Sequence, residues 1–521
     1  MKKRSGAEAL VESLDKAGVE IVFGYPGANV IGIFNALRRK RTRFVLGRHE
    51  QGCVHMADGY ARTLGRPGVV LVTSGPGLTN TITGLGTANM DGVPMVLICG
   101  QVPLNQIGTD AFQEADTTGL TRSVSKHNFL VQSADEIPET VAQAFYIATH
   151  GKPGPVVIDI PANCQEDLTE AKYPERVSLR AYHPEVYASP SEVSRLAKLI
   201  NEAKRPLIYA GGGVIASGAA EEVRRLAHKA SIPVVTTMMG LGAIDEHDEF
   251  ALGLAGIYGS SAAKQAVESA DLILALGMRF NDRTTGEVKT FARKTKLVHV
   301  DCDPASINKN VTCQLGIVAD IKDLLTTVDS RITPAKRPAW IKAKLDNCAA
   351  KRTAGIRSRE VVEAVSKAVK GDVIVATDVG QHQLAAAKYF QHVYPRHFIT
   401  SGGMGAMGFG IPAAIGAALA RPEHKVVALV GDGGAQMTAE ELIVAVTEKL
   451  PVTFVVFRND ALGLVGNLEL ENPDFVRLAA AYGMKAVKVT DKKQLDGAIA
   501  RALRTKAPVL VEVQVVQEET V

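Results

Sequence analysis

A glycine-rich turn near the end of the chain and an asparagine farther on could together hold a metal ion and a diphosphate. Gly431-Asp432-Gly433 follows one apolar run, and Asn459 ends the next, 27 residues after the aspartate. The pattern predicts a strand–helix–strand unit, whose parallel strands end on the same edge of the sheet. Asp432 and Asn459 would then offer oxygen atoms to one point, as Mg²⁺ prefers. The glycines let a diphosphate approach the backbone where the helix begins.

The helix inside this unit is predicted from Thr438 to Lys449, opened by a capping box of Thr438 and Glu441. A lone Gly-Asp-Gly is most often an ordinary turn. The spacing to Asn459 and the pattern between them are what favour the metal site.

A second candidate is Arg48-His49-Glu50, which follows the run RFVLG and opens the predicted helix QGCVHMADGYART. The helix dipole favours a glutamate in a first turn whatever its function, so Glu50 also has an ordinary interpretation. His49 and His55 do not have the HExxH spacing, which argues against a zinc protease.

The stretch from Ser401 to Gly408 contains a formal GxGxxG after a predicted strand. A Rossmann dinucleotide site is therefore a rival interpretation of this loop. However, no acidic residue ends the next predicted strand, as that fingerprint requires.

These segments, with GTDAFQE from Gly108, resemble the thiamine-diphosphate enzymes, and the wider chain resembles the acetolactate synthase large, catalytic subunit family. The resemblance implies that Asp432, the Asn459 side chain and the Ala461 carbonyl bind Mg²⁺. The family usually has Asn-Asn where this chain has Arg458-Asn459, and the second Asn is the ligand. It also implies that Glu50 hydrogen-bonds N1′ of the cofactor's aminopyrimidine ring, so that N4′ can remove the C2 proton.

The resemblance assigns further residues to the cofactor. The Gly405 carbonyl would accept the 4′-amino group, and Met407 would wedge between the two rings. The other cofactor-binding positions are Pro26, Gly27, Ser74, Gln381, His382, Gly431, Asp432, Gly433, Gly434, Asn459, Leu462 and Gly463.

Other positions resemble the family's substrate and flavin sites. Gln113 would face the active site as a catalytic residue, with Ala28 and Asn29 near the reacting carbon. Arg283 would pair with the carboxylate of a 2-oxo acid, and Leu468 takes the place of a tryptophan at the substrate entrance. FAD, which the net carboligation does not use and which can therefore be lost, would bind at Arg122, Gly211, Gly212, Gly213, Arg279, Asp301 and Asp320.

The chain departs from the family around the substrate. Pro-Gly-Gly-Ala is replaced by Pro26-Gly27-Ala28-Asn29, and Pro-Lys-Asp by Pro161-Ala162-Asn163, which removes a lysine. Part of the family sequence is missing between Leu468 and Pro473, and the C-terminal arm that covers the site is absent. We expect a wetter site, in which protonation competes with carboligation. The donor and acceptor therefore stay open.

Such residues need a scaffold of parallel strands. Apolar runs rich in Val and Ile, each followed by a glycine-rich turn and a helical pattern, are typical of strands buried on both faces. Five such runs fall in a first block, four in a second and five in a third. We predict an α/β fold of three doubly wound parallel-sheet domains.

The predicted domains are a pyrimidine-binding domain at 1–170, a central FAD-binding-like domain at 190–330, and a diphosphate- and Mg²⁺-binding domain at 355–521. Linkers are expected at 166–190, which is polar, and at 331–356, which is basic with a short helix around Trp340.

Composition fits a cytoplasmic enzyme. The 521 residues are too many for one core, and a net charge of +4 calls for neither nucleic acid nor membrane. The six cysteines form no CxxC pair, so we expect reduced thiols. The basic N-terminus lacks the apolar region of a signal peptide.

The resemblance implies a decarboxylation of a pyruvate-like 2-oxo acid, dependent on thiamine diphosphate and Mg²⁺, with carboligation to a second 2-oxo acid. Alternatives are a related decarboxylase or carboligase, and a non-catalytic member, against which the intact Glu50, Asp432 and Asn459 argue. In the family the glutamate and the GDG turn of one site come from different subunits, so we expect a homodimer or homotetramer. A regulatory subunit is a further partner that the resemblance allows.

Overall fold

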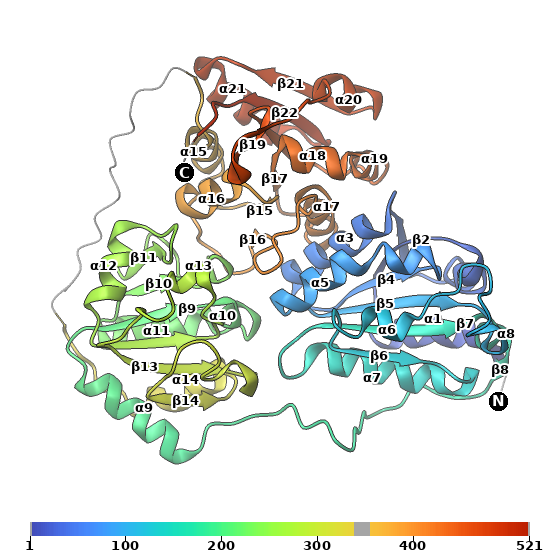
Figure 1. Cartoon of the computed structure of the whole chain (residues 1–521), viewed down its shortest axis with the longest axis horizontal. Helices are drawn as coiled ribbons and strands as arrows, with labels where there is room; N and C mark the ends of the chain where they lie inside the picture. The colour runs from blue at the N-terminus through green and yellow to red at the C-terminus, as the bar shows by residue number, and fades with distance from the viewer. Residues whose placement is uncertain (1–2, 338–354, 519–521) are drawn as a thin grey trace.

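A computed structural model describes residues 3–337 and 355–518, and the chain forms three six-stranded parallel sheets with helices on both faces (Figure 1). The predicted α/β class is thus confirmed. The helix predicted around Trp340 lies outside the described residues. Among those described, no helix has the length and apolar character needed to cross a bilayer.

The N-terminal sheet has the order β3-β2-β4-β5-β7-β6. Its strands are β2 (Ile21–Tyr25), β3 (Arg43–Leu46), β4 (Gly68–Val72), β5 (Met95–Gln101), β6 (His127–Leu130) and β7 (Pro155–Pro161). Its helices are α1 (Gly6–Lys16), α2 (Ile31–Leu37), α3 (Glu50–Leu64), α4 (Pro76–Thr79), α5 (Ile82–Asp91), α6 (Thr117–Thr121), α7 (Ile137–Thr149) and α8 (Ala162–Glu166). The two ends of this domain pair with each other in a short antiparallel ladder of β1 (Arg4–Ser5) and β8 (Leu168–Thr169).

The middle sheet has the order β11-β10-β9-β12-β13-β14. Its strands are β9 (Pro206–Ala210), β10 (Val234–Thr236), β11 (Ala251–Leu254), β12 (Leu272–Leu276), β13 (Lys296–Asp301) and β14 (Leu315–Val318). Its helices are α9 (Pro190–Glu202), α10 (Gly212–Ala216), α11 (Ala220–Ala230), α12 (Ser261–Ser269), α13 (Asp282–Thr285) and α14 (Ile321–Asp329). An extended segment joins it to the N-terminal sheet along one side of the molecule (Figure 1).

The C-terminal sheet has the order β16-β15-β17-β18-β22-β21. Its strands are β15 (Ile374–Thr377), β16 (Phe398–Ile399), β17 (Val426–Gly431), β18 (Val452–Arg458), β21 (Lys485–Val489) and β22 (Val509–Gln514). Its helices are α15 (Ser358–Val369), α16 (Gln381–Tyr389), α17 (Gly410–Ala420), α18 (Asp432–Met437), α19 (Leu442–Thr447), α20 (Phe475–Ala481) and α21 (Lys492–Arg504). A hairpin of β19 (Ala461–Leu462) and β20 (Leu468–Glu469) follows β18.

Within the three six-stranded sheets, the sequence pattern misses four strands: β6, β11, β14 and β21. Each lies at an edge of its sheet. An edge strand has a neighbour on one side only and is less covered, so its residues need not form a continuous apolar run. In β21, for example, only Val489 is buried.

One hydrophobic core serves both the N-terminal and the C-terminal sheets. Neighbouring residues of β2 point to opposite faces, with Val22 in a core under α1 and α7 and Phe23 in the shared core. Helices α3 and α17 cross in this shared core (Figure 1). Glycine at two positions lets the two backbones approach closely. A Cβ on Gly416 would lie 1.8 Å from the Met56 carbonyl oxygen, and one on Gly59 would lie 2.1 Å from the Ala413 carbonyl oxygen.

Candidate active site

The predicted metal turn brings Asp432 against the end of the neighbouring strand. Strands β17 and β18 pair in parallel, with Gly431 opposite Phe457. The Asp432 Oδ2 atom accepts hydrogen bonds from the backbone N–H of Asn459 at 3.1 Å and of Asp460 at 2.8 Å. Burial raises the pKa of the Asp432 carboxyl, and these N–H donors oppose the rise. The two predicted ligand positions therefore lie side by side at one sheet edge.

The remaining predicted ligand follows in the same turn. The Asn459 Oδ1 atom accepts from the Ala461 N–H at 3.3 Å. The three positions together can offer carboxylate, amide and carbonyl oxygen, with no nitrogen or sulfur donor. This donor set suits a hard cation such as Mg²⁺.

Helix α16, which begins with Gln381 and His382, packs against the glycines Gly431 and Gly463. A Cβ on Gly431 would lie 2.8 Å from the His382 ring, and one on Gly463 would lie 2.6 Å from the Gln381 side chain. Burial lowers the pKa of His382 to about 4, so the ring is neutral, and its Nε2 accepts the Gly431 N–H at 3.2 Å. The structure therefore brings together four residues that were predicted from the sequence: Gln381, His382, Gly431 and Gly463.

The glycine-rich loop from Ser401 to Gly408 covers the same turn. Met407 and Leu462 both lie over Gly433, because a Cβ there would be 3.2 Å from the Met407 methyl and 2.8 Å from a Leu462 methyl. Gly405 adopts a positive φ of 65°, which glycine tolerates without strain. A side chain on Gly433 would fill the space between this loop and the turn, as expected if a cofactor approaches the backbone here.

Asp378 organises this loop and was not predicted from the sequence. It is fully buried, and its carboxylate accepts the N–H groups of Val379 at 2.8 Å, Gly408 at 3.1 Å and Gly410 at 2.8 Å. Burial raises its pKa to about 6. Gly434 packs directly against this carboxylate. An acid that ends a buried parallel strand was the available signal.

Glu50 begins helix α3, as predicted. Its Oε2 atom accepts a hydrogen bond from the Asn80 side chain at 2.9 Å. Gly77, in the short helix α4 after β4, faces the same carboxylate, since a Cβ there would lie 3.7 Å from Glu50 Oε1. The structure thus places Glu50 among turns at the carboxyl edge of the N-terminal sheet.

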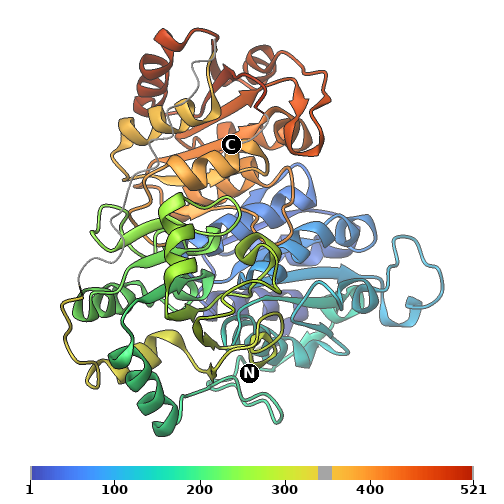
Figure 2. The same cartoon turned by 60° about the vertical axis from the view of Figure 1, so that its left-hand side comes forward.

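The other predicted residues of the N-terminal half gather on the same edge. Asn29 donates from Nδ2 to Ser74 Oγ at 2.6 Å, and its backbone N–H donates to the Thr73 hydroxyl at 3.3 Å. Gln113 packs against Gly75, within a loop after β5 that projects from the molecule (Figure 2). Pro26 and Ala28 are exposed, and Gly27 lies against Thr73.

Glu441 is a residue that sequence reasoning misassigned. Thr438 makes no side-chain cap, and the helix predicted over 438–449 is broken into a 3₁₀ turn and α19. The fully buried Glu441 carboxylate instead crosses to the other domain, where Oε1 accepts the N–H groups of Arg48 at 3.1 Å and His49 at 3.0 Å. A Cβ on Gly52 would lie 2.0 Å from Glu441 Oε1, so only glycine fits there. Glu441 therefore holds the turn that begins the Glu50 helix.

The two clusters belong to different domains of the chain, Glu50 to the N-terminal sheet and Asp432 to the C-terminal sheet. Among residues 3–337 and 355–518, no hydrogen bond or ion pair joins Glu50, Asn29 or Ser74 to the Asp432 turn. Large apolar side chains are exposed near both, namely Ile31, Leu46, Phe112, Met437, Leu464, Val465 and Leu468.

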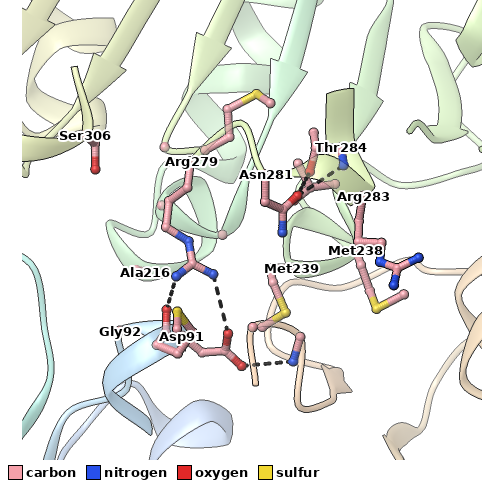
Figure 3. Close-up of a pocket in the computed structure, with 18 of the residues that line it drawn as sticks. Asp91, Gly92, Ala216, Met238, Met239, Arg279, Asn281, Arg283, Thr284 and Ser306 are labelled. Carbon is pink, nitrogen blue, oxygen red and sulfur yellow. Dashed lines mark hydrogen bonds and ion pairs between the residues drawn. The ribbon is translucent and has the colours of Figure 1, made fainter. Parts of the chain in front are cut away.

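A cavity of about 600 Å³ lies where the three domains meet, and Figure 3 shows it. Five of the seven predicted flavin positions line it: Gly212, Gly213, Arg279, Asp301 and Asp320. Arg122 is exposed and Gly211 packs against Gly277, and neither lines the cavity.

The Arg279 side chain spans the cavity towards the N-terminal domain (Figure 3). It donates to the Met90 carbonyl at 2.5 Å and lies 3.8 Å from Asp91. Asp91 also accepts the Gly402 N–H at 3.0 Å and pairs with Arg62 at 2.9 Å. One buried carboxylate thus connects all three domains.

The two predicted substrate residues are exposed. Arg283 lines the cavity, and its guanidinium donates to the Tyr258 hydroxyl at 3.1 Å. Leu468 pairs with Leu462 in the β19–β20 hairpin and points its side chain to solvent.

Comparison with known proteins places these features in a family. Models of the thiamine pyrophosphate enzyme N-terminal, central and C-terminal domains match residues 4–120, 193–328 and 378–513. The acetolactate synthase large subunit of Haemophilus influenzae is 42% identical, over 100% of this chain and 96% of that protein. The probable acetolactate synthase large subunit of Methanocaldococcus jannaschii is 41% identical, over 98% of this chain and 91% of that protein. Acetolactate synthase 2, chloroplastic, of Nicotiana tabacum is 41% identical, over 99% and 83%.

Proposed function

Because the chain belongs to the acetolactate synthase large-subunit family of thiamine pyrophosphate enzymes, we propose that it decarboxylates pyruvate and joins the remaining two-carbon unit to a second 2-oxo acid. The observation that carries this is the meeting of Asp432 with Asn459 at adjacent strand ends, beside glycines that leave the backbone accessible. Bound thiamine diphosphate supplies a carbon nucleophile and an electron sink for the loss of CO₂.

The residues of the C-terminal domain hold the cofactor's charged end. Asp432, the Asn459 side chain and the Ala461 carbonyl hold Mg²⁺, while Gln381 and His382 support the turn from below. Neutral His382 keeps its Nε2 lone pair on the Gly431 N–H, which fixes the turn without adding charge. Met407 and Gly405 hold the cofactor's rings from the covering loop.

The N-terminal domain supplies the residue for proton transfer to the cofactor and the residues that face the substrate. Glu50 lies at a helix N-terminus and is oriented by Asn80, where it can exchange a proton with the cofactor's ring nitrogen. Gln113, Ala28 and Asn29 lie on the same sheet edge and form the substrate side. Arg283, which lines the central cavity, binds the carboxylate of the 2-oxo acid.

A complete site needs both clusters, and the two belong to different domains of the chain. We therefore place Glu50 of one subunit against the Asp432 turn of a second copy, in at least a homodimer. The exposed apolar side chains near both clusters support this arrangement. Because its relatives are called large subunits, a regulatory small subunit is a further proposed partner.

FAD is proposed to occupy the central cavity. The lining glycines Gly212 and Gly213 leave room for a ligand, and Arg279 offers a cation. Flavin absorption that copurifies with the protein tests this.

The direct test is to incubate the protein with pyruvate, thiamine diphosphate and Mg²⁺ and to measure acetolactate. Acetolactate formation supports the proposal, and its absence from a cofactor-loaded protein contradicts it. A second candidate is a related decarboxylase, favoured by Ala162, which stands in place of the lysine of the family's Pro-Lys-Asp at the substrate channel. Release of aldehyde in excess of ligation product would identify that activity.

A further inference from the structure

The short segment that follows the β19–β20 hairpin returns to the metal turn. Leu470 donates its N–H to the Asp460 carbonyl at 3.0 Å, which brings residues 470–473 back to the end of β18. The Asn472 amide then donates from Nδ2 to Asp432 Oδ2 at 2.9 Å and to Asp460 Oδ1 at 2.9 Å. One neutral NH₂ group thus bridges two carboxylates.

Asn472 is itself held in place. Its Oδ1 atom accepts from Gln436 Nε2 at 2.8 Å, and Gln436 also donates to the Glu471 carbonyl at 3.0 Å. Gln436 belongs to α18, the helix that Asp432 begins. Arg458 completes the arrangement from the other side, because it pairs with Asp460 Oδ1 at 2.8 Å. Arg458 and the shortened segment are both departures from the family pattern, and they meet at Asp460.

The two oxygens of Asp432 are consequently unequal. Oδ2 accepts three hydrogen bonds, from the N–H groups of Asn459 and Asp460 and from the Asn472 amide. Within the part of the chain that the structure describes, Oδ1 accepts one, from the neighbouring Gly433 N–H at 3.0 Å. A carboxylate oxygen has about two lone pairs, so Oδ2 is saturated and Oδ1 keeps capacity for a further partner.

We propose that Asn472 is a positioning residue for the metal ion, whose amide holds Asp432 so that it binds the cation through Oδ1 alone. This rests on the metal site of the proposed function. A carboxylate limited to one oxygen suits the octahedral, closely spaced coordination of Mg²⁺, whereas Ca²⁺ readily takes both oxygens. Asn472 therefore contributes to the preference for Mg²⁺ over Ca²⁺.

The test is calorimetric titration of the full chain with Mg²⁺ and with Ca²⁺, in the presence of excess thiamine diphosphate. For Asn472→Ala we expect Mg²⁺ affinity to fall by roughly 10- to 100-fold, as is typical when a group that orients a ligand is lost. Ca²⁺ affinity should fall less, because a freed Oδ2 can join its coordination. The control Glu471→Ala, at an exposed neighbouring side chain, should leave both affinities unchanged.

An equal loss of both affinities in Asn472→Ala, or no loss, overturns the proposal. If that variant does not fold, Gln436→Ala decides, since it leaves Asn472 present but unsupported: the Mg²⁺-to-Ca²⁺ ratio should fall, and an unchanged ratio overturns the proposal. Asp432→Ala separates this from failure of the metal site itself. If Asp432→Ala binds Mg²⁺ as the unaltered protein does, the site is elsewhere and the proposed function fails with it.

Discussion

The Glu441 carboxylate is buried between two domains. Its hydrogen-bond partners are backbone N–H groups and not a cationic side chain. Burial raises its pKa from 4.5 to about 7, opposed by the hydrogen bonds from the Arg48 and His49 N–H groups and helped by a smaller rise from Glu440. The folded state therefore binds this proton more tightly than the unfolded state does. The stabilisation is fully present below pH 4.5 and is lost as the pH rises through 7.

This predicts a pH-dependent difference between the unaltered protein and Glu441→Gln. The two pKa values of 4.5 and about 7, at about 1.4 kcal/mol per pKa unit, correspond to about 3 kcal/mol. Glutamine lacks this proton linkage, so the stability deficit of the variant should shrink between pH 5 and pH 8. Denaturant unfolding at both pH values measures it. A deficit independent of pH would show that Glu441 does not titrate in this range.

Glu50 gives the second prediction at this scale. Glu50→Gln should lower kcat by roughly 100- to 10,000-fold, the usual contribution of a group that transfers protons. Thiamine diphosphate should still bind, because the residues proposed to hold its diphosphate lie in the other cluster. Glu20→Gln, at an exposed acid of the same domain, is the control. Unchanged turnover in Glu50→Gln would remove the carboxylate from the mechanism.

At the scale of the element, helices α3 and α17 pack so closely that no side chain fits between them at their crossing. Gly59 and Gly416 let the two backbones touch where the shared core crosses from one domain to the other. Such contact excludes even a methyl group, since interiors pack as densely as crystals. The position of Glu50 at the start of α3 depends on this crossing.

Gly416→Ala should therefore destabilise the protein by about 1–3 kcal/mol or more, the usual effect of overpacking. Gly497→Ala in α21 is the matched control, because its added methyl meets only the end of the Arg501 side chain. Alanine is favoured over glycine in a helix by about 1 kcal/mol, so the control should gain stability. Unfolding midpoints compare the two. If both variants gained stability, the close approach of α3 and α17 would be wrong.

At the scale of the whole molecule, the separation of the two clusters predicts that activity requires two copies. Glu50→Gln and Asp432→Ala should each be inactive alone. When the two are co-expressed, a mixed dimer has one site with both residues intact and one with neither. Random pairing then restores about a quarter of full activity, since half of the dimers are mixed and half of their sites are complete.

Acetolactate formation by the separate and the co-expressed variants measures this. Co-expression of Glu50→Gln with Gln113→Ala, whose residues lie in the same cluster, is the control, and it should restore nothing. Recovery in both pairs would contradict a site shared between subunits, as would recovery in neither.

The sequence by itself determined the α/β class and the family, because buried parallel strands require continuous apolar runs and because the spacing between Asp432 and Asn459 is fixed by one strand–helix–strand unit. Edge strands such as β21 were not predicted from the sequence, since they are less covered and carry fewer apolar residues. Only the tertiary structure decided the partners of Glu441, Asp378 and Asn472. Apart from the Val379 N–H, which follows Asp378 directly, their partners lie from 12 to 393 residues away, and no local pattern records which backbone N–H or carboxylate a folded chain brings to a polar side chain.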